Sequence, residues 1–366
     1  MISSLPKHKC TGCSACASAC PRHCISMTAD NEGFLYPSID ADKCIGCQLC
    51  DRVCPVQKEA PQHPLLAVLG VQNKDDGVRL HSSSGGTFTL LAKCVLDGGG
   101  AVFGVHYNEE LDVEHTCITE TAKLTQLQGS KYVQSVIGSC FQKAKELLEQ
   151  DVPVLFSGTP CQIAGFKGYL GRDYPNLLTV DLVCHGVPNA MIYHKYLKEL
   201  AAEAGEAVQE VRFRDKGNGW LRGKTMFITE HREFAASKRE DPYMRLFLNN
   251  VLIRPSCADC PFNNKRNLSD LTVADYWGVN KQYPDFDDDK GTTLLLINTA
   301  KGEAFFNKIA IQANCISTTF EKACMANTAL AGRLSLHAQR AAFFEHLDEH
   351  TIREWADLLL GPLPSK

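Results

Sequence analysis

The sequence predicts an α/β main domain, with α+β as the alternative arrangement, preceded by a small cysteine-rich N-terminal domain. Strand-like and helix-like apolar segments alternate from about residue 65 onward, which is typical of a layered α/β fold. Before them, one four-cysteine pattern occurs twice within residues 1–57. A chain of 366 residues suits two or three domains of roughly 100–200 residues each, so both parts can fold around their own cores.

Composition narrows the class of protein. The chain is 44% hydrophobic and 22% charged, as globular proteins are, and its net charge of −4 comes with no basic stripe for nucleic acid. The amino end, "MISSLPKHKC", lacks the apolar stretch of a secretory signal. Runs such as "PLLAVLGV" are far shorter than the ~20 residues of a transmembrane helix, so we expect a soluble, cytoplasmic protein. In such a chain, 18 clustered cysteines favour metal binding over disulfides.

The segments "CTGCSACASACP" and "CIGCQLCDRVCP" share the pattern Cys-x2-Cys-x2-Cys-x3-Cys-Pro. This is the pattern of bacterial two-cluster ferredoxins, in which the fourth cysteine ligates the other cluster. Structural zinc is the alternative, but a duplicated run with this spacing disfavours it. Cys24 falls outside the pattern and is interpreted as a buried thiol. The spacing assigns Cys10, Cys13, Cys16 and Cys54 to a first 4Fe-4S cluster, and Cys44, Cys47, Cys50 and Cys20 to a second.

The polar, proline-bearing residues 58–64 are predicted to be a linker. Beyond it, apolar periodicity predicts both kinds of element. The predicted strands are 65–72, 101–107, 113–120, 152–158, 177–184, 208–214, 271–277 and 292–299, and the predicted helices 87–100, 139–150 and 190–205. We expect residues 65–150 and 151–335 to form the N- and C-terminal parts of the main domain, and residues 336–366 a helical tail.

Two glycine-rich segments resemble nucleotide-binding motifs without matching them. "DGGGAVFGV" follows a helix and precedes a strand, the reverse of a dinucleotide-binding fingerprint. In "GNGWLRGKT", five residues separate Gly217 from Gly223 where a phosphate loop needs four, and the strand-like "MFITE" follows instead of a helix. Both sets of glycines are therefore interpreted as structural.

Four further cysteines could form a third site. Cys161 and Cys184 each follow a strand-like run, and ligands collect at the carboxyl ends of strands in open α/β sheets. Two such loops could face the pair Cys257 and Cys260 in "RPSCADCPF". Four thiolates suit zinc or an iron–sulfur cluster alike, and spacing alone does not choose. A third cluster would give electrons from the ferredoxin-like module a destination. The remaining cysteines (Cys94, Cys117, Cys140, Cys315 and Cys324) lie in apolar patterns and are interpreted as core thiols.

Several motifs occur in a distinctive order: "SSSGGTFTLLA", "QGSKYVQS", "FSGTPCQIAG", "DLVCHGVP", "FRDKGNGW", "RPSCADCPF" and "LTVADYWG". Over residues 65–335 the chain thereby resembles the family of coenzyme F-420-reducing hydrogenase and formate dehydrogenase beta subunits, which includes iron–sulfur flavoproteins acting on chlorophyll intermediates. The resemblance implies non-covalent FAD beside a third 4Fe-4S cluster, with the ligands Cys161, Cys184, Cys257 and Cys260.

The resemblance also implies where FAD binds. A turn with hydroxyls, glycines and a following helix offers free N–H groups to a pyrophosphate. This turn consists of Ser83, Ser84, Gly85, Gly86 and Thr87, and a second segment offers Ser130, Lys131, Tyr132 and Gln134 for phosphate or reduced flavin. Thr159 and Gln162 are expected to tune the third cluster through hydrogen bonds. His185 is either a proton donor or a core histidine, Trp220 and Trp277 are expected to pack, and no catalytic acid is assigned.

These features predict an iron–sulfur flavoprotein oxidoreductase. Electrons would pass from ferredoxin or a similar one-electron donor through three 4Fe-4S clusters to FAD, and then as hydride to a small-molecule acceptor. That acceptor would be a deazaflavin coenzyme or an unsaturated substrate, and electron flow in the reverse direction is equally compatible. The alternative is a non-catalytic electron-transfer subunit of a larger hydrogenase or dehydrogenase complex.

Overall fold

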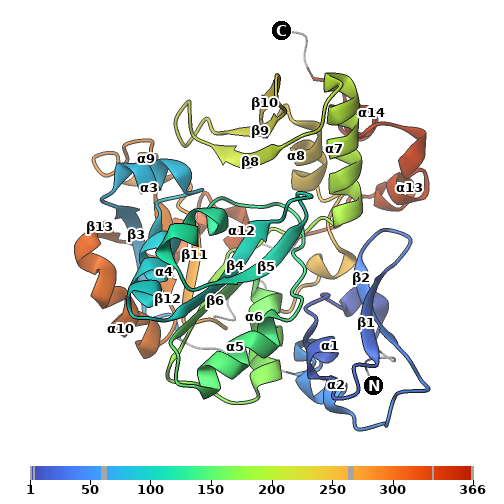
Figure 1. Ribbon diagram of the computed structural model, residues 1–366. Helices are drawn as coiled ribbons and strands as arrows, with labels where there is room; N and C mark the ends of the chain where they lie inside the picture. The colour runs from blue at the N-terminus through green and yellow to red at the C-terminus, as the bar shows by residue number, and fades with distance from the viewer. Residues whose placement is uncertain (1, 3–4, 59–63, 263–267, 332–333, 364–366) are drawn as a thin grey trace.

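The computed structural model describes residues 2, 5–58, 64–262, 268–331 and 334–363. It confirms a mixed α/β main domain with a small ferredoxin-like region at the N-terminus (Figure 1). Most of the predicted linker, residues 59–63, lies outside the described residues.

One eight-stranded sheet forms the centre of the main domain, in the order β13-β3-β12-β11-β7-β6-β4-β5. β4, β6, β7 and β11 run parallel to one another, and the strands outside them pair antiparallel. The strands are β3 (Ala67–Asn73), β4 (Ala101–Tyr107), β5 (Val113–Ile118), β6 (Val154–Gly158), β7 (Leu177–Leu182), β11 (Leu271–Asp275), β12 (Thr293–Ile297) and β13 (Ala313–Ser317). Because β6 and β7 are parallel neighbours, the loops after them leave the same edge of the sheet.

Helices cover both faces of this sheet. Val102 and Leu155 contribute to the core under α4 (Thr87–Asp97) and α10 (Ala300–Ile309). The next residues along each strand, Phe103 and Phe156, point to the other face and pack with α5 (Cys140–Glu149) and α6 (Pro160–Leu170). Such alternation follows from the two-residue period of a strand. Shorter helices are α3 (Asp76–His81), α9 (Val279–Gln282), α11 (Phe320–Cys324) and α12 (Thr328–Ala331), with 3-10 turns η4 (Thr121–Leu127), η5 (Pro255–Cys257) and η6 (Ala310–Gln312).

A second, three-stranded antiparallel sheet lies beside the main sheet, at the top of Figure 1. It consists of β8 (Glu210–Asp215), β9 (Lys224–Ile228) and β10 (Glu233–Ser237). A separate core joins it to α7 (Ala190–Ala204), α8 (Pro242–Leu248), α13 (Arg340–Glu345), η7 (Leu347–Glu349) and α14 (Ile352–Leu360). β9 begins within "GNGWLRGKT", so this segment leads into a strand and is not a phosphate loop.

The N-terminal module repeats its backbone as well as its cysteines. Gly12 and Gly46 both have φ of +67°, and Ser14 and Gln48 both adopt left-handed conformations before short helices. The elements are η2 (Lys7–Lys9), α1 (Ala15–Ala19), the antiparallel hairpin β1 (Ile25–Ala29) and β2 (Leu35–Ile39), α2 (Leu49–Val53) and η3 (Pro55–Gln57). The two halves of the module therefore wrap their cysteines in the same way.

The module docks on α6. A Cβ atom placed on Gly165 would lie 2.8 Å from the Cys13 Sγ, and one on Gly168 would lie 2.4 Å from the Val53 carbonyl oxygen. Only glycine permits this approach of α6 to α1 and α2. Along the described part of the chain, no helix is long and apolar enough to cross a bilayer.

Candidate functional site

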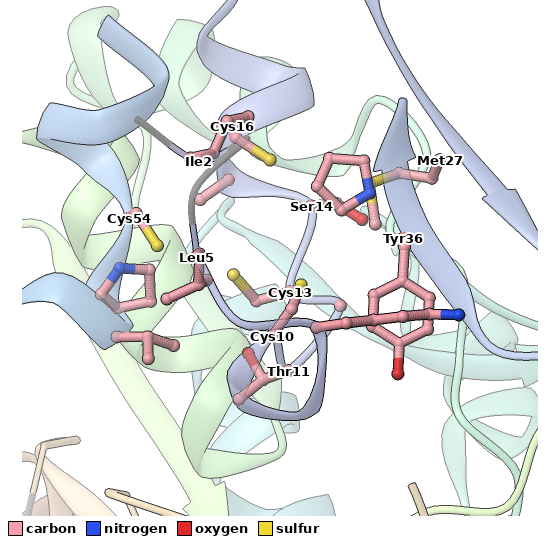
Figure 2. Close-up of a pocket in the computed structure, with 16 residues that line it drawn as sticks. Ile2, Leu5, Cys10, Thr11, Cys13, Ser14, Cys16, Met27, Tyr36 and Cys54 are labelled. Carbon is pink, nitrogen blue, oxygen red and sulfur yellow. The ribbon is translucent and has the colours of Figure 1, made fainter. Parts of the chain in front are cut away.

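The first cysteine quartet surrounds a cavity of ≈ 250 Å³. Cys10, Cys13, Cys16 and Cys54 all line it, and Figure 2 shows their sulfur atoms around one space. These thiols converge because of the loop before α1. The left-handed conformation of Gly12 lets the backbone turn tightly there, so successive cysteines point toward the same space.

Burial makes these thiols poor anions on their own. It raises the pKa of Cys16 to about 12, with a further contribution from the negative charge of Cys10, and it raises the pKa of Cys13 further still. Several thiolates in one buried cavity require compensating positive charge. Iron in a 4Fe-4S core supplies such charge, so the donor set fits the cluster that the spacing predicts.

The second quartet lies near the surface and contains an additional cysteine. Cys44 and Cys47 are exposed, whereas Cys20 is buried. The Sγ atoms of Cys20 and Cys24 lie 3.3 Å apart, and Cys24 also interacts with Cys44. Cys24 is buried, as expected of a core thiol, but it lies within the group of cysteines assigned to the second cluster. The spacing rule gave no reason to expect it there.

The structure brings the third set of four cysteines together. Cys161 opens α6 directly after β6, and Cys184 follows β7, so both emerge at the edge where these parallel strands end. The 3-10 turn η5 supplies Cys257, and Cys260 follows it. All four line one small cavity of ≈ 30 Å³. Burial raises the pKa of Cys184, and the neighbouring thiolates add to this. No three of these described sulfur atoms lie within 4.8 Å of one another, which is wider than the ligand set of a single zinc ion and leaves room for a larger metal centre.

The first and third quartets adjoin. Thr11, from the loop that carries the first quartet, lines both cavities. Cys161 is near enough to Cys13 for its negative charge to raise the pKa of that thiol. The sequence gave no sign of this contact, because the two cysteines are far apart along the chain.

A hydrogen-bond network supports Cys161. The Thr159 hydroxyl lies 3.2 Å from the Cys161 Sγ, and the Gln162 Oε1 accepts from the Thr159 backbone N–H at 3.0 Å. Gln162 in turn donates through Nε2 to the Ser135 hydroxyl at 3.0 Å. Ser135 lies 3.0 Å from Nδ1 of His115, whose Nε2 lies 3.0 Å from the Ser157 carbonyl oxygen. Since a carbonyl only accepts, Nε2 carries a proton, and burial lowers the pKa of the imidazole to about 4, which keeps the ring neutral near pH 7.

The two segments expected to hold FAD meet in the structure. The Ser130 N–H donates to the Ser83 hydroxyl oxygen at 2.6 Å, and the two hydroxyls lie 2.8 Å apart. Lys131 donates to the carbonyl oxygens of Gln128 and Gly129. The Thr87 hydroxyl, in the first turn of α4, is buried without a hydrogen-bond partner among the described residues. Free amides at the start of α4 and this hydroxyl suit an anionic group.

Other polar groups of the turn are already engaged by protein. The Ser84 hydroxyl donates to the Thr292 carbonyl oxygen at 2.8 Å, and the Gly85 N–H donates to the Thr293 hydroxyl at 2.9 Å. A Cβ on Gly85 would lie 2.2 Å from the Val71 carbonyl oxygen, so this glycine is required for packing against β3. Gly86, at φ +80°, is the N-cap residue of α4.

The second segment is also partly engaged elsewhere. Gln134 donates through Nε2 to the Thr11 carbonyl oxygen at 2.9 Å, and therefore contacts the N-terminal module. The Tyr132 ring packs edge-on against Phe213, with ring centroids 5.3 Å apart.

Cations that sequence reasoning missed gather beside the turn. Lys216 is buried and donates to the Ser84 carbonyl oxygen at 2.6 Å, and burial lowers its pKa to about 7. Arg214 pairs with Asp275 at 2.6 Å and stacks over Trp277 at 4.9 Å. Their signal is the "FRDKGNGW" motif itself, whose charged residues precede the glycines.

His185 and the tryptophans occupy packed positions. The His185 ring contacts Phe247 edge-on at 5.0 Å, and burial lowers the pKa of the imidazole. Trp220 and Trp277 stack with ring centroids 4.8 Å apart.

The first and third quartets adjoin, and the second quartet lies near the surface. Together they define an iron–sulfur protein organised for electron transfer. Residues 9–58 match the model of the 4Fe-4S dicluster domain. Residues 152–322 match the family that comprises the C terminus of the coenzyme F420 hydrogenase/dehydrogenase beta subunit. The resemblance seen in the sequence motifs is thereby confirmed, over residues 152–322 for the beta-subunit family and over residues 9–58 for the 4Fe-4S dicluster domain.

The fold agrees with this relationship. A chain in a xenon-derivatised structure of the F420-reducing [NiFe] hydrogenase complex from Methanosarcina barkeri is similar, with a TM-score of 0.51 and 15% sequence identity. The similarity covers 81% of this chain and 92% of that chain. No curated protein sequence matches this chain.

Proposed function

We propose that the chain is an iron–sulfur flavoprotein oxidoreductase that takes electrons from ferredoxin or another one-electron donor and delivers them to a small organic acceptor. The observation that carries this proposal is the contact between the first and third quartets, across which Thr11 lines both cavities. Contact between two cluster sites is expected of an electron relay, and core thiols would not require it.

The proposed route enters at the second quartet, continues to the first and then reaches the third. The second quartet is the outermost, with Cys44, Cys47 and the intervening Ile45 exposed, which suits docking of a protein donor. The third quartet lies beside the carboxyl ends of the neighbouring parallel strands β6 and β7. The proposed domain boundaries follow this division. Residues 1–57 would accept electrons from the donor, residues 65–335 would form the reaction centre, and residues 336–366 would form a helical tail.

When bound, 4Fe-4S clusters carry single electrons and FAD couples them to two-electron chemistry such as hydride transfer. We propose that its pyrophosphate lies at the start of α4, near Ser83, Thr87 and Ser130. Burial lowers the pKa values of Lys131 and Lys216 to about 7, and the negative charge of the pyrophosphate would keep both protonated there. Ser84 and Gly85 would support the turn, since their polar groups are engaged within the protein.

Anaerobic iron and sulfide analysis tests the cluster inventory. Three 4Fe-4S clusters correspond to ~12 iron atoms per chain, and Cys257→Ala should lower the number to ~8. Zinc should be measured on the same samples, because four thiolates also form zinc sites. About eight irons in the parent, unchanged in Cys257→Ala, would remove the third cluster.

Anaerobic stopped-flow absorbance tests the order of flow. In Cys184→Ser, provided that both ferredoxin clusters and FAD are retained, a one-electron donor should reduce the clusters at the parental rate while flavin reduction slows. Flavin reduction as fast as in the parent would show that electrons bypass the third site.

Flavin release on denaturation tests the FAD site. Lys131→Gln should weaken FAD binding, whereas Lys143→Gln, on the exposed face of α5, should not. Gly85 is unsuitable for this test, because any side chain there collides with β3. Folded protein that binds no FAD in excess cofactor would contradict the flavin assignment.

A non-catalytic electron-transfer subunit of a larger redox complex is the second candidate. It is favoured by the similarity to a chain from a hydrogenase complex. Purification from native cells distinguishes the two: a lone chain with dithionite-reducible flavin supports the enzyme, and obligate co-purification with other subunits supports the second candidate.

A further inference from the structure

Arg254 is a fully buried cation between the first and third quartets. Its side chain is 0% exposed. Nε donates to the carbonyl oxygen of Cys10 at 2.7 Å, which places the guanidinium against the loop of the first quartet. Its own backbone carbonyl accepts from the N–H of Cys257, a member of the third quartet, at 2.9 Å.

The other contacts of this guanidinium are uncharged. Nη1 donates to the Gln134 Oε1 at 3.1 Å, and Nη2 donates to the Leu35 carbonyl oxygen at 2.9 Å. The Tyr36 ring lies 4.2 Å from the guanidinium carbon. No carboxylate of the described residues lies within ion-pairing distance of Arg254. A buried charge without a counter-ion is strongly disfavoured, so Arg254 requires an anion of another kind.

The two quartets supply that anion when they hold clusters. A 4Fe-4S core with four thiolates carries net negative charge, and reduction adds more. Thr11, the residue after Cys10, lines both cavities, so the contact of Nε with the Cys10 carbonyl oxygen places the guanidinium beside both sites. Gly12 is needed for this position, because a Cβ there would lie 2.7 Å from Nη1.

We propose that Arg254 is the shared counter-ion of the first and third clusters and that its positive charge raises the reduction potential of both. The inference rests on the proposed clusters. A cation beside an anionic cluster stabilises the reduced form more than the oxidised form, because the reduced form carries more negative charge. The electron would thus be held where the two sites adjoin, and the exposed second cluster would be unaffected.

EPR-monitored redox titration of the anaerobic holoprotein tests this proposal. In Arg254→Gln, the first and third clusters should become harder to reduce by about tenfold in the reduction equilibrium, equivalent to 59 mV for a one-electron couple. Arg254→Lys keeps the charge and should restore most of the difference. The second cluster provides an internal reference in every sample.

Arg340→Gln is the matched control. Arg340 is another buried arginine that contacts the N-terminal module, but it has its own carboxylate partner, Glu32, at 2.6 Å. The Arg340→Gln substitution perturbs the same contact with the N-terminal module, but the charge it removes is already paired with Glu32. The reduction potentials of the first and third clusters should therefore be unchanged. An equal shift in Arg340→Gln would assign the effect to interface disturbance and overturn the proposal.

Gln134→Glu provides a second route if Arg254→Gln does not retain its clusters. The new carboxylate would lie against Nη1 and neutralise the cation in place, so both potentials should again fall. Unchanged potentials in protein with full iron content would overturn the role of Arg254 while leaving the three-cluster proposal intact. If iron analysis finds only eight irons, the third cluster fails, and the shift of the first cluster still decides the role of Arg254.

Discussion

At the scale of single residues, Cys24 changes the interpretation of the second quartet. Its Sγ lies 3.3 Å from that of Cys20, and it also interacts with Cys44, so a further thiol lies among the ligands assigned to the second cluster. Since thiolate ligands are bound by position and charge, a cysteine so placed can substitute for its neighbour.

Substitutions at these two positions test such replacement. Cys24→Ser should leave the iron content unchanged, and Cys20→Ser should retain most of the second cluster through Cys24. The double variant should lose ~4 irons per chain, one 4Fe-4S cluster. Iron analysis with EPR of the reduced protein measures this. Loss of the cluster in Cys20→Ser alone would show that Cys24 does not substitute.

His115 makes stability depend on pH. Burial lowers its pKa from 6.5 to about 4, so the folded protein holds the ring neutral while the unfolded chain takes up a proton as pH falls below 6.5. Stability is therefore lost between pH 6.5 and about 4, by about 3 kcal/mol at the lower end.

The measurement is urea unfolding across this pH range for the parent and His115→Gln. Cluster absorbance is recorded to confirm that both retain iron. The parent should show the steeper loss of stability toward acid. Equal slopes in the two proteins would mean that another group is responsible.

At the scale of elements, α6 organises the site. Its N-terminus carries Cys161 beside β6, and its glycine face receives α1 and α2 of the N-terminal module. One helix thus fixes the distance between the first and third quartets. Capping by Thr159 and Gln162 defines where this helix begins.

Gly168→Ala tests the docking of the module. The added Cβ would lie 2.4 Å from the Val53 carbonyl oxygen, so α2 and α6 must separate, at a cost of about 1–3 kcal/mol. Chemical denaturation and iron content should both report the loss. Gly98→Ala is the control, because its Cβ would have no contact closer than 3.4 Å. A Gly168→Ala protein as stable as the control would contradict the close packing of α6.

At the scale of the whole molecule, a late segment of the chain contacts the N-terminal module. Arg340, from α13 near the C-terminus, forms two hydrogen bonds with the Glu32 carboxylate, at 2.9 and 2.6 Å. Phe34, which is fully buried, lies under this pair. The β1–β2 hairpin of the N-terminal module and α13 are therefore held together, and Figure 1 shows both on the same side of the molecule.

A double-mutant cycle with Glu32→Gln and Arg340→Gln should give a coupling energy of about 1–3 kcal/mol in unfolding experiments, since both groups are largely withdrawn from water. The exposed pair of Lys123 and Glu120 should give below about 1 kcal/mol. Additive effects at Glu32 and Arg340 would indicate that they do not act as a pair.

The sequence by itself determined the features that depend on local spacing. The duplicated cysteine run is enough to assign a dicluster domain, because three of the four thiols that wrap each cubane are close along the chain and the fourth has a fixed place in the other run. Strands such as 101–107 were predicted at their observed bounds, since apolar periodicity is also local.

Only the tertiary structure decided the rest. Cys161 and Cys184 meet because β6 and β7 are neighbours in the sheet, and strand order depends on contacts between distant segments. The same holds for Gly85, whose role is packing against β3, and for Arg254, which has no carboxylate partner among the described residues. A sequence lists charges and thiols, but burial and long-range pairing determine which of them lack a partner.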